Sequence, residues 1–314
     1  MKRLFALILV LCMVFALCAC KGEEKPTEPT ATGTPLLYKV TDGDGDVIWL
    51  FGSIHVGRPE FYPLPDYVLE AYNSAESVGF EFDIIDYQAD MQLQVETLSA
   101  MLYRDGTTIQ EHIPAQLYED AVAAMTELGI YNEMMDYYYP VVWYSLIDSA
   151  IVEQIGGQSD LGVDMHLLQK AHDEGKTVEE LEYAKFQMDL LGTFSEELQI
   201  ILLESAVAAS GEPETAKQQL NAMLDAWLQG DPALIEMAVS DDTSDMDSQE
   251  AALYAEFTQA MITDRNISMT DYAEDALEAG REVFICVGAA HIVGEGAMAD
   301  LLEQRGYTVQ IVTE

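Results

Sequence analysis

The chain has 314 residues and a formal net charge of −42, because 56 aspartates and glutamates outnumber 14 lysines and arginines. Nucleic acids and anionic lipid surfaces attract basic patches, so this charge excludes a nucleic-acid partner and electrostatic binding to anionic lipid. The length suits one large domain or two small ones.

The first residues follow the pattern of a bacterial export signal. A basic head, Met1-Lys2-Arg3, precedes an apolar run of fourteen residues at 4–17. A spanning helix needs about 20 apolar residues, so the run fits the core of a signal peptide. The Leu-Cys-Ala-Cys that follows resembles a lipobox, which makes Cys20 the lipidated residue and 1–20 the lipoprotein signal. A plain signal peptide with incidental cysteines is the alternative.

Residues 21–35 contain three prolines and no large apolar side chain, a composition that predicts a flexible tether. A lipid on Cys20 would then anchor the protein to the membrane, with a folded domain at 36–314 outside the cytoplasm. Cys286 is the only cysteine after Cys20, so the mature chain has neither a disulfide framework nor a cysteine metal site.

Short β-rich runs and turn residues predict the strands nearest the N-terminus. Residues 36–40 and 47–51 are expected to form a hairpin around the acidic turn 42–46. That turn is also rich in calcium-type ligands, but it lacks the distal glutamate of a full calcium loop. A helix from Pro65 to about Ser74 and a strand over 77–83 are expected next.

Beyond this point the apolar periodicity is mainly helical. Helices are predicted at 114–129, 140–155, 195–209, 214–229 and within 291–306, and strands at 176–181, 281–288 and 307–312. We therefore expect an α/β (α+β) fold, in which strands from both ends of the chain form one central sheet covered by a large helical insert at about 86–280. The acidic segment 240–250 is expected to be a solvated connection that caps a helix, with a cation site as the alternative.

Two of the five histidines have a setting that suits chemistry. His55 and His291 each follow an apolar strand and a glycine, with another glycine shortly after. The carboxyl ends of strands line the ligand crevice of open α/β sheets, and glycine lets the backbone approach a ligand closely. A histidine there can bind a metal or act as a general base. His112, His166 and His172 are expected to be surface or packing residues.

Glu81 adds a carboxylate at the end of the strand over 77–83, with Asp83 on the same face of that strand. A buried carboxylate is costly unless it is paired or bound to a metal. His55, Glu81 and His291 therefore predict a divalent-metal site with open positions for water. Two ordinary histidines at strand ends are the alternative.

A single GxxH motif is a weak signal for a protein family, but five sequence blocks in a fixed order are a strong one. They are LFGSIHVG (50–57), VGFEFD (78–83), LGVDMHLLQKAHDEGKTVEELEYAKFQ (161–187), DRN (264–266) and VGAAHIVGEGAMADLLEQRGYTV (287–309). Together they resemble the TraB/PrgY/GumN family, which includes the TIKI ectoproteases of animals. The resemblance spans almost the whole mature chain and implies a fold related to erythromycin-esterase-like and ChaN-like proteins. Tyr183 departs from it, since relatives often have threonine there.

The resemblance also implies which residues carry the chemistry. The implied catalytic set is His55, Glu81, Arg265 and His291, and further matching positions are Asp164, Glu182 and Gln187. Arg265 would clamp a substrate carboxylate or a developing oxyanion, or would simply pair with an acid. Glu182 is either a supporting carboxylate of the site or a helix-capping acid.

TIKI-type relatives are described as proteases that depend on a divalent metal, and no HExxH motif occurs here. We therefore expect a lipid-anchored, extracytoplasmic metallohydrolase that acts on peptides or proteins with a divalent cation such as Mn, Co or Zn. One alternative is a surface lipoprotein that binds a peptide or a metal complex without turnover. Another is a structural lipoprotein without a metal.

Overall fold

A computed structural model describes residues 33–240 and 246–313. The predicted signal peptide, the lipidation site Cys20 and residues 21–32 of the predicted tether lie outside these ranges. None of the helices in the described ranges has both the length and the apolar character that crossing a bilayer requires.

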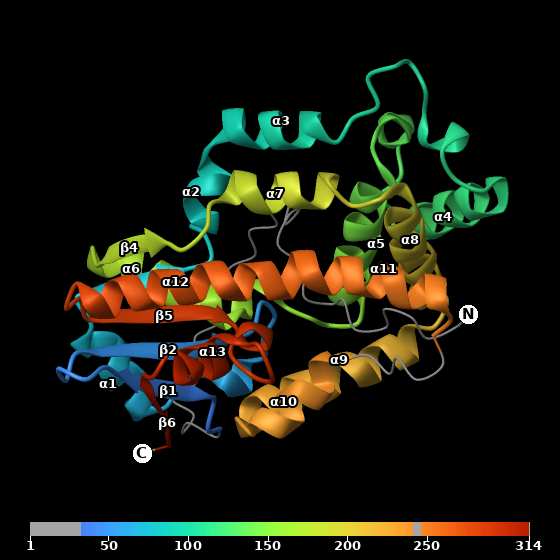
Figure 1. The fold of residues 1–314 in the computed structure, drawn as a ribbon. Coiled ribbons are helices and arrows are strands. Elements are labelled where there is room, and N and C mark those ends of the chain that lie inside the picture. The colour runs from blue at the N-terminus through green and yellow to red at the C-terminus, as the bar shows by residue number, and fades with distance from the viewer. Residues whose placement is uncertain (1–32, 241–245, 314) are drawn as a thin grey trace.

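A six-stranded mixed sheet in the order β4-β3-β5-β2-β1-β6 organises the described molecule (Figure 1). Its strands are β1 (Leu37–Thr41), β2 (Val47–Ser53), β3 (Ser77–Phe80), β4 (Thr177–Glu180), β5 (Val283–Gly288) and β6 (Thr308–Val312). Neighbours from β4 to β2 run parallel, whereas β1 is antiparallel to both β2 and β6. The carboxyl ends of β2, β3, β4 and β5 therefore meet at one edge of the sheet.

This arrangement confirms the predicted α/β class and the sheet built from both ends of the chain, with one difference. The strand β4 belongs to the insert, yet it pairs with β3 as an edge strand of the same sheet. Its residues are exposed or half-buried, whereas every position of β3 and β5 is buried. The continuous apolar run of β5 follows from its central place, because a parallel strand covered on both faces has no solvent side.

The predicted hairpin turn is present between β1 and β2. The carboxylate of Asp42 accepts hydrogen bonds from the backbone N–H groups of Asp44, Gly45 and Asp46, at 2.8–2.9 Å. An aspartate that bonds its own following backbone stabilises a tight turn, which accounts for the acidic composition of this segment.

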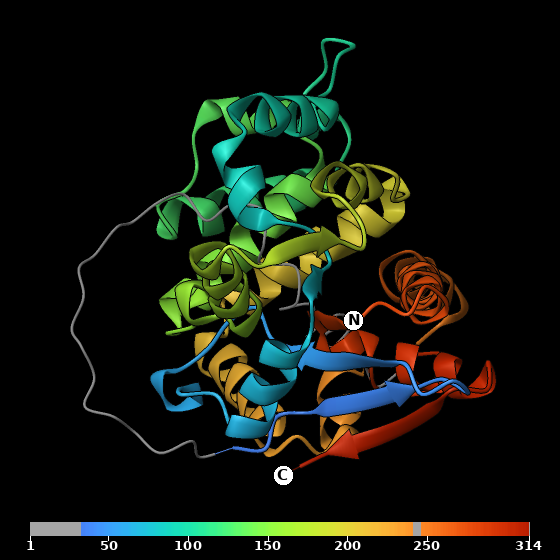
Figure 2. The ribbon, with the colours of Figure 1, turned by 90° about the vertical axis from the view of Figure 1, so that its left-hand side faces the viewer.

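Helices cover both faces of the sheet (Figure 2). On one side lie α1 (Asp66–Ser74) and α6 (Val163–Glu174), and on the other α12 (Asp264–Glu278) and α13 (Met298–Gln304). The buried ring of Phe284 on β5 lies 5.6 Å from the ring of Phe51 on β2 and 5.7 Å from that of Tyr72 on α1. Aromatic packing across β5 therefore joins the sheet to its covering helix.

The insert contributes most of the remaining helices. They are α2 (Ile84–Ala89), α3 (Met91–Ala100), α4 (Ala115–Glu127), α5 (Pro140–Gln154), α7 (Ala184–Gly192), α8 (Glu196–Ser210), α9 (Pro213–Gln229), α10 (Pro232–Val239) and α11 (Ser248–Thr258). The long amphipathic helices predicted from periodicity correspond to α4, α5, α8 and α9. A five-residue π-turn, Gln259–Thr263, joins α11 to α12 directly before Arg265.

The described part of the acidic segment 240–250 caps a helix, as expected. The carboxylate of Asp247 accepts the backbone N–H groups of Gln249 and Glu250 at the start of α11, and the Glu250 side chain accepts the N–H of Asp247. This reciprocal capping box accounts for two of the acids in the segment without a cation.

Candidate functional site

Three predicted site residues meet where the parallel strands end. His55 follows β2, Glu81 follows β3 and His291 follows β5. A methyl group placed on Gly288 would lie 3.4 Å from Glu81 Oε1, 3.7 Å from His55 Nε2 and 3.7 Å from His291 Cδ2. The side chains therefore surround one point, and the glycine at the end of β5 leaves that point open.

His55 is oriented by a carboxylate from the insert. Its Nδ1 lies 2.6 Å from Asp164 Oδ2, at the first turn of α6. Nδ1–H donates to this carboxylate, so Nε2 is the nitrogen that faces Gly288. Burial alone would lower the pKa of His55, but the charge and hydrogen bond of Asp164 outweigh it and raise the pKa to about 9. The metal-free ring is therefore an imidazolium at neutral pH.

His291 is oriented by an amide from α12. Asn266 Nδ2 donates to the Gly296 carbonyl at 3.0 Å, which turns Asn266 Oδ1 toward His291 Nδ1 at 2.8 Å. Nδ1 of His291 therefore carries the proton, and Nε2 keeps its lone pair. Burial and the charge of Arg265 lower the pKa of His291 to about 3, so this ring is neutral where His55 is charged.

Glu81 is held at both carboxylate oxygens. Its Oε1 accepts the backbone N–H of Gly288 at 2.9 Å, and its Oε2 accepts Arg265 Nη2 at 2.6 Å and Gln187 Nε2 at 3.1 Å. Burial would raise the pKa of this carboxyl, but Arg265, the two histidines and the Gly288 N–H hold it well below its usual range. Glu81 is therefore ionised at neutral pH.

Arg265 joins two buried carboxylates. Its Nε and Nη2 donate to Glu182 at 3.0 and 2.9 Å, its Nη2 donates to Glu81, and its Nη1 donates to the Met261 carbonyl at 3.2 Å. Gln187 bridges the same two carboxylates, with Nε2 2.8 Å from Glu182. This geometry matches the ion-pair alternative for Arg265, because each of its nitrogens already donates within the protein. It also makes Glu182 and Gln187 supports of Glu81.

The donor set suits a divalent cation, although one member stands farther out. His291 Nε2 and Glu81 Oε1 are 3.9 Å apart, a spacing that one cation with bonds of about 2 Å can bridge. Each imidazole has its Nδ1 tied to a side-chain oxygen, as metal-binding histidines commonly have. His55 Nε2 must move closer to complete the set, since His55, Glu81 and His291 are not among the described groups whose ligand atoms all lie within 4.8 Å of one another.

The group that does meet that spacing in the described ranges is Asp83, Asp86 and His172. Asp83 was expected to share a strand face with Glu81, but β3 ends at Phe80 and Asp83 instead caps the start of α2. Its Oδ1 accepts the N–H of Asp86 at 3.0 Å, and its Oδ2 lies 2.7 Å from His172 Nε2. A helix cap and a hydrogen bond between the buried Asp83 carboxylate and the exposed His172 account for this cluster without an ion.

The other two histidines occupy the packing positions expected for them. His112 stacks on Tyr103 with ring centroids 4.0 Å apart, and His166 packs on Tyr62 at 4.4 Å. His112 Nδ1 also lies 3.8 Å from Glu196 Oε1, a longer contact than the 2.6 Å between His55 and Asp164.

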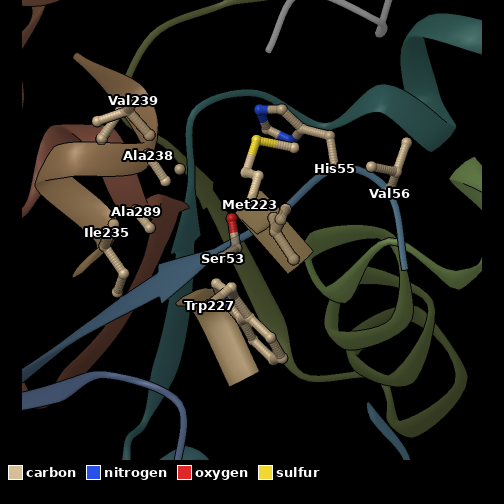
Figure 3. A pocket seen from close by; sticks show the side chains of 12 residues that line it. Ser53, His55, Val56, Met223, Trp227, Ile235, Ala238, Val239 and Ala289 are labelled. Atoms are coloured by element: carbon tan, nitrogen blue, oxygen red, sulfur yellow. The ribbon is translucent and has the colours of Figure 1, made fainter. Parts of the chain in front are cut away.

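An apolar pocket opens beside His55, between the end of β2 and the helices α9 and α10 (Figure 3). Met223 and Trp227 from α9, and Ile235 and Val239 from α10, form its apolar wall. The empty space, including the opening to solvent, is about 490 Å³. Sequence reasoning missed this wall, because helical periodicity marks apolar faces without showing which of them borders the site. It also missed the role of Asn266, although the DRN block contained it.

Comparisons with known proteins agree with the resemblance stated above. The uncharacterized protein YbaP of Escherichia coli (strain K12) and that of Shigella flexneri are each 24% identical over 255 residues, which cover 81% of this chain and 86% of the relative. No solved structure matches the chain, so the expected likeness to erythromycin-esterase-like and ChaN-like folds stays a prediction. The sequence model of the TraB/PrgY/gumN family matches residues 36–311, and the chain therefore belongs to that family.

Proposed function

We propose that the protein is a divalent-metal-dependent hydrolase that cleaves peptide bonds outside the cytoplasm, anchored by a lipid on Cys20. The main support is the convergence around Gly288 of His55 Nε2, Glu81 Oε1 and the His291 ring. Each imidazole is held at Nδ1 by a side-chain oxygen, so both rings present the other nitrogen to the same point. Imidazoles held at Nδ1 in this way are typical of metal centres.

His55, Glu81 and His291 would hold the cation, with Mn, Co and Zn as the candidates. When bound, such a cation polarises a carbonyl and makes water more acidic. Neighbouring residues of the protein orient the ligands and fix their charge. Asn266 keeps His291 in the tautomer with a free Nε2, and Arg265 with Gln187 holds Glu81 ionised and aimed at Gly288. Arg265 acts here as a positioning residue.

His55 couples the site to pH. Because its pKa is raised to about 9, the ring must lose a proton before Nε2 can bind a cation. Asp164 stabilises either state, as a counter-ion of the imidazolium or as the acceptor that fixes the neutral tautomer. Cation binding should therefore release a proton at neutral pH.

One observation favours the alternative function, binding of a peptide or a metal complex without hydrolysis. Four of the five N–H groups of Arg265 donate to Glu81, to Glu182 or to the Met261 carbonyl, so this arginine keeps a single Nη1 N–H for a developing oxyanion. The same crevice would then bind a peptide or a metal complex without turning it over. The two functions predict the same ligands and differ in the appearance of product.

The discriminating experiment is digestion of a defined peptide library by the metal-stripped protein, with and without added Mn²⁺, followed by mass spectrometry. We expect cleavage only with the cation, and loss of the products in His55→Ala and in His291→Ala. The matched control is His172→Ala, which removes a histidine paired with an acid away from the Gly288 site. Metal-dependent binding without product would favour the alternative function, and products that persist in both site variants would refute the proposal.

Anchoring rests on the lipobox pattern at Cys20 and is tested separately. In the native bacterial host, replacing Cys20 with serine should move the protein from the membrane fraction to the soluble extracytoplasmic fraction. An unchanged distribution would refute lipidation at this residue without bearing on the chemistry of the site.

A further inference from the structure

The pocket beside His55 shares part of its wall with the proposed metal site. We call it the Trp227 pocket; its lining includes Ser53, His55, Met223, Trp227, Ile235 and Val239. His55 and Gly288 border both the pocket and the metal site. A group bound at Gly288 therefore lies directly beside the pocket.

The Trp227 side of the pocket is held in place by several contacts. Trp227 is 2% exposed, and its indole Nε1 donates to the Gly52 carbonyl on β2 at 2.8 Å. The ring of Phe61 packs against it with centroids 4.5 Å apart, and Phe51 meets it edge-on at 6.5 Å. The indole therefore keeps its place, and the space in front of it is preformed.

Ser53 supplies a polar group to this apolar space. Its side chain points toward Met223 in the pocket (Figure 3), and the residue is 2% exposed. Apart from a weak interaction with the Cys286 thiol, Ser53 Oγ has no hydrogen-bond partner among the described residues. A buried hydroxyl without a full partner is costly, so a ligand in the pocket that hydrogen-bonds Ser53 Oγ would remove this cost.

We propose that the Trp227 pocket receives a large aliphatic or aromatic side chain of the substrate peptide, next to the bond held at Gly288, while Ser53 Oγ hydrogen-bonds that residue's backbone amide. This inference rests on the proposed hydrolase function and adds a substrate class to it. A charged side chain would lose its hydration against this wall without gaining a partner. Alanine or glycine would leave the space without contacts.

The size of the preference follows from the chemistry of apolar pockets. One methylene more or less in such a pocket changes discrimination by about 10- to 200-fold. We therefore expect at least about tenfold selectivity for leucine or phenylalanine over alanine at this position.

The first test measures binding alone and does not depend on hydrolysis. In the full-length protein labelled with ¹³C at its methionine methyl groups, Met223 reports from inside the pocket, whereas Met237 on the same helix–helix unit is 69% exposed and reports from outside. Acetyl-leucinamide should shift the Met223 resonance and leave that of Met237 in place, and acetyl-glycinamide should shift neither. Equal responses to the two probes, or none at Met223, would overturn the inference.

The second test fills the pocket. Ala238 lines it from α10 and is half-buried, so Ala238→Trp should block it, whereas Met237→Trp places the same side chain on the exposed face of that helix. Ala238→Trp should lower the leucine-over-alanine cleavage ratio at least about tenfold, and Met237→Trp should keep the ratio of the parent protein. An unchanged ratio in Ala238→Trp overturns the inference while hydrolysis itself stands. If no peptide is cleaved, the hydrolase proposal fails, and the Met223 and Met237 shifts alone test whether the pocket binds an apolar side chain.

The role assigned to Ser53 has its own readout. Ser53→Ala should weaken acetyl-leucinamide and acetyl-phenylalaninamide by a similar factor, because it removes a backbone contact and leaves the apolar wall intact. Unchanged affinity for both probes would overturn the hydrogen bond to the substrate amide.

Discussion

Replacing Arg265 with methionine should leave the buried carboxylates of Glu81 and Glu182 without their cationic partner. Arg265 is 5% exposed, and Glu81 and Glu182 are each 6% exposed. Its Nη2 lies 2.6 Å from Glu81 and 2.9 Å from Glu182. Removing one partner of a buried ion pair costs about 3–5 kcal/mol, because the remaining charge stays desolvated. We expect Arg265→Met to lower the free energy of unfolding by about that amount at neutral pH.

The loss of unfolding free energy in Arg265→Met should depend on pH. The pKa of Glu81 in the folded protein is held below its ordinary value of 4.5, mainly by Arg265 against the opposing effect of burial. A depressed carboxyl pKa stabilises the fold above pH 4.5, and this stabilisation is lost as the pH falls. The difference in the free energy of unfolding between the parent protein and Arg265→Met should therefore become smaller as the pH falls.

Arg305 provides a matched control, since it also contacts two carboxylates. Its guanidinium lies 2.7 Å from Asp271 and 2.8 Å from Glu274, but its side chain is 25% exposed and that of Asp271 is 61% exposed. Exposed pairs contribute about 0–1 kcal/mol, so Arg305→Met should cost little. Urea unfolding followed by circular dichroism measures the loss of unfolding free energy in each of the two variants. A loss in Arg265→Met no larger than that in Arg305→Met would refute the buried-network reasoning.

Three further predictions concern the two histidines and one glycine. In NMR titrations of metal-free protein, His291 should stay neutral to well below pH 6.5, and His55 should stay protonated to about pH 9. Because the pKa of His55 is raised, its contribution to stability is complete below pH 6.5 and lost through pH 9, and ordinary titration of both rings would contradict this. Asn266→Ala should weaken Mn²⁺ binding about 10- to 100-fold in calorimetry, since His291 loses its orienting acceptor, and unchanged affinity would count against that role. Gly57→Ala would place a methyl group 1.9 Å from the Leu161 carbonyl oxygen and should cost about 1–3 kcal/mol in urea unfolding, whereas parental stability would show that the contact relaxes freely.

The meeting of His55, Glu81 and His291 was predictable from the sequence for a physical reason. Each follows a β-rich run, and the carboxyl ends of neighbouring parallel strands share one edge of a sheet. Two positions beyond β3 show the limit of that reasoning. Alternation along a strand placed Asp83 beside Glu81, but the strand ends at Phe80 and the chain turns into α2, so Asp83 caps a helix instead.

Residues supplied by the insert could not be placed from sequence alone. The roles of Arg265 and Asn266 depend on how α12 crosses the sheet and on which carboxylates and carbonyls it meets there. Trp227 lies on a helix whose periodicity shows a buried face but not that this face borders β2. Contacts of this kind are set by tertiary packing, which local sequence patterns do not encode.

The most direct test of the central claim is calorimetric titration of the metal-stripped protein with Mn²⁺, in the parent, His291→Ala and His172→Ala. We expect one binding site for Mn²⁺ that releases a proton at neutral pH, is lost in His291→Ala and is retained in His172→Ala. Proton release is read from buffers of different ionisation enthalpy. Binding that persists in His291→Ala and disappears in His172→Ala would contradict a metal site at Gly288 and would move the cation to the cluster of Asp83, Asp86 and His172.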